Sequence, residues 1–184
     1  VDTDAFELPI MGRFRNHIEV VPSFPDWKEW ALEHGIHPMI PAYLICFPEH
    51  FYTVIDNIPM DPRKWTYASD GLYDSEKYGM NIDDEWDSGM PQEIFNSFTV
   101  FKQEYEMYKN VLAFIKGEKP MKEDLNTQYA FASAVLSALS DKIDDAVVNT
   151  WFTERNVKIY AEVVNYMNYA IMTKHKALTK TESN

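Results

Sequence analysis

The feature that most constrains the fold is an apolar stripe with helical spacing in residues 92–116. Its members follow one another at intervals of three or four residues: Ile94, Phe98, Phe101, Tyr105, Tyr108, Leu112 and Ile115. This spacing predicts one long helix with a single apolar face. Such a face must be covered by other elements, so the chain needs a packed helical environment around it.

Most of the remaining chain also contains residues that typically begin or end helices. Ser23 is placed to cap one helix, and Gly35 to end it. Asp61 and Pro62 mark the start of another helix, which we expect to end at Gly71. The expected helices besides 92–116 cover residues 23–35, 38–47, 61–71, 126–139, 143–152 and 156–178.

Two segments depart from the helical pattern. Residues 14–21 read as a short strand, the only convincing one in the chain, and a single strand needs a sheet that this sequence does not otherwise supply. Residues 74–91 are polar and acidic, which is typical of an exposed loop. The fold class predicted from the sequence is therefore all-α, with one strand near the front.

The charge balance excludes several kinds of partner. Seventeen basic and 29 acidic residues give a net charge of −12, which disfavours direct binding to nucleic acid or to an anionic membrane surface. The sequence contains no apolar run long enough to span a bilayer. Cys46 is the single cysteine, so we expect a packed thiol, a reducing compartment and a cytoplasmic protein.

The usual motifs of nucleotide and metal chemistry are missing from this sequence. It has no GxxxxGK[ST] loop and no apolar strand ending in Asp-Glu. His34 and His37 lie three residues apart, but a turn is expected between them and no further ligand is in sequence reach, so no metal site is predicted.

Several pieces, read in order, nevertheless match a known pattern. "LPIMGRFRNHIEV" is followed by "DWKEWALEHGIHPMIPAYLICFPE", then by "DPRKWTYASD" and later by "QEIFNSFTVFKQEYEMYKNVLAFIKGE". This ordered set resembles the C-terminal part of MoxR-like AAA+ ATPases, from about Leu8 to about Leu139. The resemblance implies that residues 1–22 end an ATPase core, that 23–116 form a helical lid, and that 117–184 form a helical extension.

The resemblance also assigns roles to arginines. Arg13, in "GRF", stands where the family places an arginine finger that reaches the ATP of a neighbouring subunit. The family spacing is not matched after this motif, so Arg15 is the alternative finger. Arg63, in "DPRKW", stands where the family places sensor 2, which touches the γ-phosphate of ATP. Without the resemblance, Arg13 is a strand-edge charge and Arg63 a surface residue of a first helical turn.

The implied parent protein binds ATP and magnesium, forms a ring of its own copies and remodels a partner. Members of this family often work with a von Willebrand factor A-type protein. The Walker motifs would then lie before Val1, and this chain alone would not hydrolyse ATP. The alternative from a different class is a complete, acidic, helical interaction or inhibitor protein of the phage type, which the net charge of −12 and the 15% aromatic content also fit.

Overall fold

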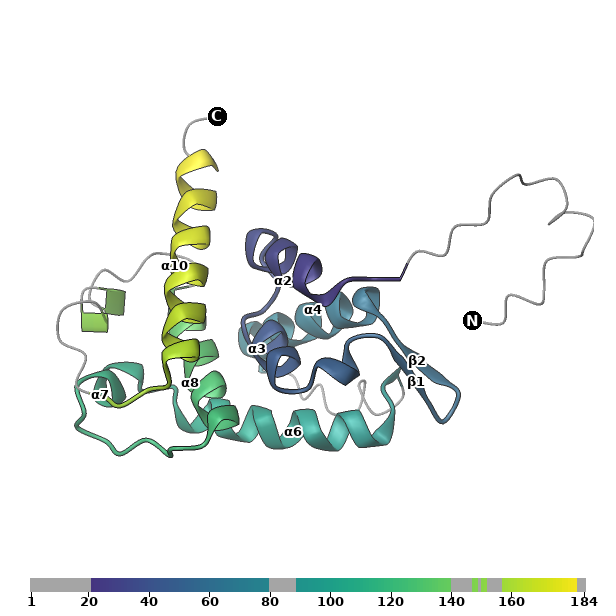
Figure 1. The fold of residues 1–184 in the computed structure, drawn as a ribbon, viewed down its shortest axis with the longest axis horizontal. Coiled ribbons are helices and arrows are strands. Elements are labelled where there is room, and N and C mark those ends of the chain that lie inside the picture. The colour runs from purple at the N-terminus through teal and green to yellow at the C-terminus, as the bar shows by residue number, and fades with distance from the viewer. Residues whose placement is uncertain (1–20, 80–88, 140–146, 149, 152–156, 182–184) are drawn as a thin grey trace, which may run out of the picture.

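The computed structural model describes residues 21–79, 89–139, 147–148, 150–151 and 157–181, with side chains as far as Thr173. This part of the chain is mostly helical, with one small antiparallel sheet of two strands (Figure 1). The prediction of a mainly helical fold is confirmed. The expected strand at 14–21 and most of the expected helix at 143–152 lie outside the described residues.

The first described helix, α2 (Phe24–Glu33), has the predicted ends. The Ser23 hydroxyl accepts a long hydrogen bond, 3.5 Å, from the Asp26 amide. Gly35 follows the helix with a φ of +73°, a left-handed conformation that favours glycine. The sequence therefore determined where this helix starts and stops.

Two helices that are buried on nearly all sides form the centre of the fold. They are α3 (Met39–Cys46) and α8 (Leu125–Ala138), which pack against each other. In α8 every residue from Thr127 to Leu136 is buried. The small side chains of Ala130, Ala132 and Ala134 leave space for neighbouring elements to approach. Helices α6 and α10 pack against the same α8, as Figure 1 shows.

The expected single helix over 92–116 is in fact two helices, α6 (Gln92–Met107) and α7 (Val111–Ile115). The break falls at Tyr108, whose buried ring packs edge-on against Phe114 and Phe131 at centroid distances of 4.7 and 5.6 Å. The apolar stripe is buried as predicted. The stripe stays continuous although the helix is interrupted, because the Tyr108 ring packs on aromatic side chains at the break.

A β-hairpin stands where the sequence analysis expected no strand, so the statement that 14–21 is the only strand was wrong. Strands β1 (Thr53–Ile55) and β2 (Ile58–Met60) pair antiparallel, with Ile55 opposite Ile58. The two linking residues, Asp56 and Asn57, both have positive φ, 52° and 62°. That is a type I′ turn, which Asp and Asn tolerate better than other non-glycine residues.

Helix α4 runs from Pro62 to Tyr78, so the predicted end at Gly71 was also wrong. The helix ends at Gly79, which has a φ of +66° and donates its amide to the Ser75 carbonyl. Leu72, just beyond Gly71, is 2% exposed. Burial of Leu72 offsets the roughly 1 kcal/mol that an interior glycine costs. The first part of the expected acidic loop at 74–91 is therefore helix.

The last described helix, α10 (Ala161–Thr181), begins later than the expected Asn156 and packs against α8 and α2. One core cluster includes residues on both sides of the expected boundary at 116/117, from Ala31 to Ile171. Among the described helices, none is both long and apolar enough to cross a bilayer. The division into lid and extension stays a prediction.

The two glycines of α4 give opposite predictions. Gly79→Ala should destabilise the protein by about 1 kcal/mol, because alanine in a left-handed conformation is strained. Gly71→Ala should raise stability by up to about 1 kcal/mol, because it improves helix propensity beside an open groove. Urea unfolding of both variants measures the difference. Destabilisation by Gly71→Ala alone would place the helix end at Gly71 after all.

Candidate functional site at the start of helix α4

Arg63 lies in the first turn of α4, directly after Pro62. The Asp61 side chain caps the helix by accepting a hydrogen bond of 2.9 Å from the Lys64 amide. Pro62 lacks an amide proton and is suited to the first helical position. Arg63 itself is exposed, and its guanidinium makes no hydrogen bond or ion pair with the residues that the structure describes.

The base of this first turn is fixed in the core. Trp65, two residues after Arg63, is fully buried, and its indole nitrogen donates to the His50 carbonyl at 3.2 Å. The Tyr43 hydroxyl and His50 Nδ1 share a hydrogen bond of 2.7 Å, and the Tyr43 ring packs on Trp65. Burial lowers the pKa of His50, which keeps its ring neutral near pH 7. The exposed Arg63 therefore lies two residues from a side chain that is anchored in the core.

The hairpin fixes the direction from which the chain enters α4. Strand β2 ends at Met60, which is 1% exposed, and Asp61 follows as the cap. The Lys64 ammonium donates to the Gly89 carbonyl at 2.9 Å. Lys64 is therefore engaged, whereas Arg63 has no such partner among the described residues.

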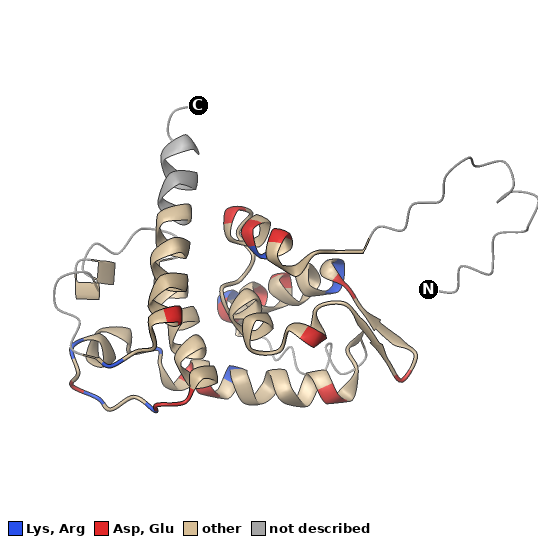
Figure 2. Cartoon of the chain, viewed as in Figure 1, with Lys and Arg blue, Asp and Glu red and all other residues tan. Residues whose placement is uncertain are grey.

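A groove of about 410 Å³ follows α4 from its start toward its middle. Its described walls combine methionine side chains, an exposed Tyr67 and two aspartates. The lining residues are Met60, Lys64, Tyr67, Ala68, Asp70, Gly71, Asp74, Gly89 and Met90. Figure 2 shows both signs of charge on α4. The aspartates of the groove repel an anion, so the helix start is the better place for a phosphate.

The other predicted arginines, Arg13 and Arg15, lie outside the described residues. Their roles therefore stay predictions.

His34 and His37 are used separately, so they do not form a ligand pair. The His34 Nδ1–H donates to the Trp30 carbonyl at 2.8 Å, and the ring stacks on the Trp30 indole. His37 is buried, and its Nδ1 accepts from the Met39 amide at 3.2 Å. Within the described ranges, no group of three or more acidic, histidine or cysteine side chains is arranged to hold a metal ion.

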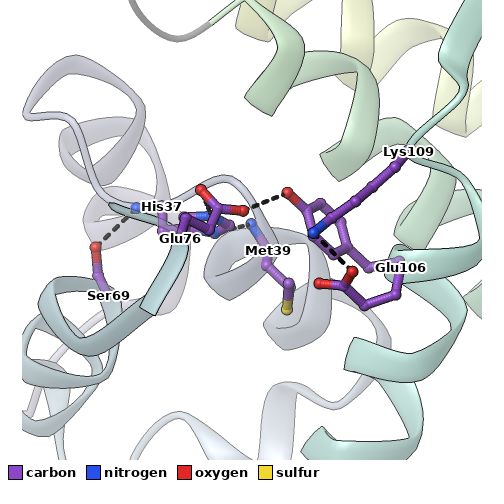
Figure 3. A network of polar contacts seen from close by, with 7 residues as sticks. His37, Met39, Ser69, Glu76, Glu106 and Lys109 are labelled. Carbon is purple, nitrogen blue, oxygen red and sulfur yellow. Dashed lines mark hydrogen bonds and ion pairs between the residues drawn. The ribbon is translucent and has the colours of Figure 1, made fainter. Parts of the chain in front are cut away.

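The sequence analysis missed a polar cluster around His37 that joins three helices (Figure 3). The Ser69 hydroxyl, on α4, accepts from the His37 amide at 2.8 Å. Because Nδ1 is an acceptor, the ring proton is on Nε2, which lies 3.4 Å from Glu76 Oε2. The Tyr105 hydroxyl, on α6, donates to Glu76 Oε1 at 2.8 Å. This cluster connects α4 and α6 with the residues just before α3.

Cys46 is half-buried against the core, in agreement with its predicted packing. Burial raises the pKa of its thiol to about 12, so the reactive thiolate is not populated near neutral pH.

Comparison of the chain with protein-family models, with curated proteins and with solved structures gives no significant match. The likeness to MoxR-like ATPases therefore rests on the sequence motifs quoted above.

Glu76 gives a prediction of pH dependence. Its contact with His37 lowers the pKa of Glu76, against the opposing effect of burial, and the Tyr105 hydroxyl adds to the lowering. A depressed pKa stabilises the fold above the ordinary value of 4.5, and this contribution is lost as pH falls through the folded value. Glu76→Gln should therefore be less stable than wild type at pH 7, with a gap that narrows below about pH 4.5.

Unfolding midpoints at pH 7, 5 and 3.5 measure this gap. Glu33→Gln, which removes an equal charge from an exposed position on α2, is the matched control. An equal gap for Glu76→Gln at all three pH values would show that the ionised carboxylate does not stabilise the cluster.

Proposed function

We propose that this chain is the lid and C-terminal helical region of a MoxR-like AAA+ ATPase. The observation that carries the proposal is Arg63, an exposed cation in the first turn of a helix that is held to the core by the buried Trp65. In the proposed role, this guanidinium contacts the γ-phosphate of ATP bound by the core of the same subunit.

The chemistry of Arg63 suits this role. A guanidinium is charged at all physiological pH values and presents a planar fork of donors that matches phosphate oxygens. The start of a helix adds a favourable dipole for an anion. Arg63 and the start of α4 fit the phosphate end of a nucleotide. The sequence has neither the Walker loop that would cradle the phosphates nor the Asp-Glu strand that would hold magnesium.

The attachment of α4 suggests how nucleotide contact would move the lid. A pull on Arg63 would be transmitted through Trp65, which is hydrogen-bonded to the His50 carbonyl and packed on Tyr43 of α3. Near the other end of α4, Glu76 contacts His37, which lies just before α3, and Tyr105 of α6. Because these contacts are buried or partly buried, the described helices would follow α4 as a unit when ATP binds.

The proposal includes features that other parts of the protein would supply. ATP and magnesium would be bound by a preceding core, neighbouring copies would form a ring, and Arg13 would act on the ATP of the next subunit. A von Willebrand factor A-type protein is the proposed partner class by family resemblance.

The first test of this function is Arg63→Ala in the protein that carries the nucleotide-binding core. Loss of a charge-assisted contact to phosphate should lower ATP turnover by about tenfold to a hundredfold. Arg63→Lys should retain part of the activity, because lysine keeps the charge and loses the fork. The matched control is Lys77→Ala, an exposed cation in the last turn of the same helix.

The melting temperature of Arg63→Ala should be close to that of wild type, because Arg63 is exposed and forms no hydrogen bond or ion pair with the described residues. Wild-type turnover by Arg63→Ala would rule out the sensor-2 role. It would leave the acidic interaction protein as the better reading of the chain.

The second test concerns the arginine finger and uses rings of mixed composition. If Arg13 acts on the neighbouring subunit, Arg13→Ala subunits mixed with wild type should lower ATP turnover more than in proportion to their fraction. Arg15→Ala subunits, mixed with wild type in the same ratios, show whether Arg13 or Arg15 is the arginine finger. A strictly proportional loss for both variants would contradict a finger acting between subunits.

A further inference from the structure

A second groove, formed by other residues than the start of α4, lies where α6 meets the beginning of α8. We name it the α6–α8 groove, and its volume is about 380 Å³. Figure 1 shows the two helices meeting at this point. The residues that line it are Phe47, Ser97, Val100, Phe101, Glu104, Lys122, Asp124, Asn126 and Thr127.

One side of the groove is apolar. Phe101 is buried, Phe47 is half-buried, and Val100 is 61% exposed beside them. Two phenyl rings and a valine offer a surface for an aliphatic or flat group, and their faces also favour a cation.

The other side carries a carboxylate with incomplete hydrogen bonding. Glu104 is 23% exposed, and its Oε1 accepts from the Lys122 ammonium at 2.6 Å. Its Oε2 is buried and has no hydrogen-bond partner in the described part of the chain. An ionised carboxylate accepts several hydrogen bonds, so a buried oxygen without one is energetically unfavourable.

The charges around Glu104 differ in how firmly they are held. Asp124 is engaged as the cap of α8, where its carboxylate accepts from the Thr127 amide at 2.8 Å. Lys122 is 56% exposed, lies in the segment before α8 and satisfies one oxygen of Glu104. Lys122 can therefore be displaced by a better donor, whereas Asp124 is held in place by its capping bond.

We propose that the α6–α8 groove binds an arginine side chain on a segment of a partner protein. The guanidinium replaces the Lys122 ammonium and donates to both oxygens of Glu104, because its fork supplies two parallel donors where an ammonium supplies one. The aliphatic stem of the arginine packs against Phe47 and Phe101. A basic partner segment also complements the net charge of −12. The site is independent of the proposed ATPase function.

The test titrates the full 184-residue chain with the peptide acetyl-Gly-Arg-Gly-amide, followed by ¹⁵N chemical shifts. The amides of Ser97, Thr127 and their neighbours should shift with saturable binding. The same peptide with citrulline, which has the shape of arginine without its charge, should bind at least about tenfold more weakly. Equal binding of the two peptides would overturn the proposal.

Variants locate the binding. Glu104→Gln should weaken the arginine peptide by about tenfold or more, whereas Glu93→Gln, an exposed carboxylate on the same helix, should leave its affinity unchanged. Lys122→Met should tighten binding severalfold, because it removes the competing ammonium. Unchanged affinity in Glu104→Gln, or weaker binding in Lys122→Met, would refute the assignment.

A second copy of the chain is the other possible source of an arginine. Sedimentation velocity at rising concentration of wild type and Glu104→Gln separates the cases. A monomer for both is expected. Self-association that Glu104→Gln abolishes would make the occupant another copy and overturn the proposal of a separate partner.

Discussion

The packing of α3 against α8 is the interaction on which the rest of this structure depends. Both helices are buried on almost all sides, which costs little because their side chains are apolar or small. The Ser133 hydroxyl within α8 donates a hydrogen bond to the Ala130 carbonyl at 2.7 Å, and the Gln128 side chain accepts one from the Tyr160 amide. These hydrogen bonds satisfy two buried polar side chains of α8, and α6 and α10 cover the helix with their apolar faces.

The position of Arg63 is a consequence of this core. Tyr43 of α3 packs on Trp65 and Phe98, and Trp65 fixes the first turn of α4 two residues beyond the arginine. The hairpin delivers the chain to that turn, and the His37–Glu76–Tyr105 cluster fixes the other end of α4. A short series of aromatic and polar contacts therefore connects the first turn of α4, which carries the exposed Arg63, to the centre of the fold. Such a connection is what a residue that reports on a bound phosphate would need.

The two proposed binding sites use opposite electrostatics. At the start of α4, the Arg63 guanidinium has no polar partner among the described residues and could bind an anion. In the α6–α8 groove, the Glu104 carboxylate has one oxygen without a described partner and could bind a cation. Acidic side chains lie on α2, α4, α6 and α10 in Figure 2. The exposed Arg63 stands out because the net charge of −12 repels the anions that a guanidinium attracts.

What the sequence alone determined is local. Ser23 and Gly35 mark the ends of α2, Asp61 and Pro62 mark the start of α4, and the apolar stripe from Ile94 to Ile115 is buried as its spacing predicts. These features depend on side chains that hydrogen-bond or pack within one or two turns, so they can be read without knowledge of distant residues.

The tertiary structure decided the rest. Gly71 does not end α4, because Leu72 and Glu76 gain contacts with the core that outweigh the weak helix propensity of glycine. The long helix is interrupted at Tyr108, where the Tyr108 ring packs against Phe131 of α8. Ser69, Glu76 and Tyr105 meet at His37 from distant positions, and Glu104 meets Lys122 in the same way. Such contacts depend on how the helices pack, which no local pattern records.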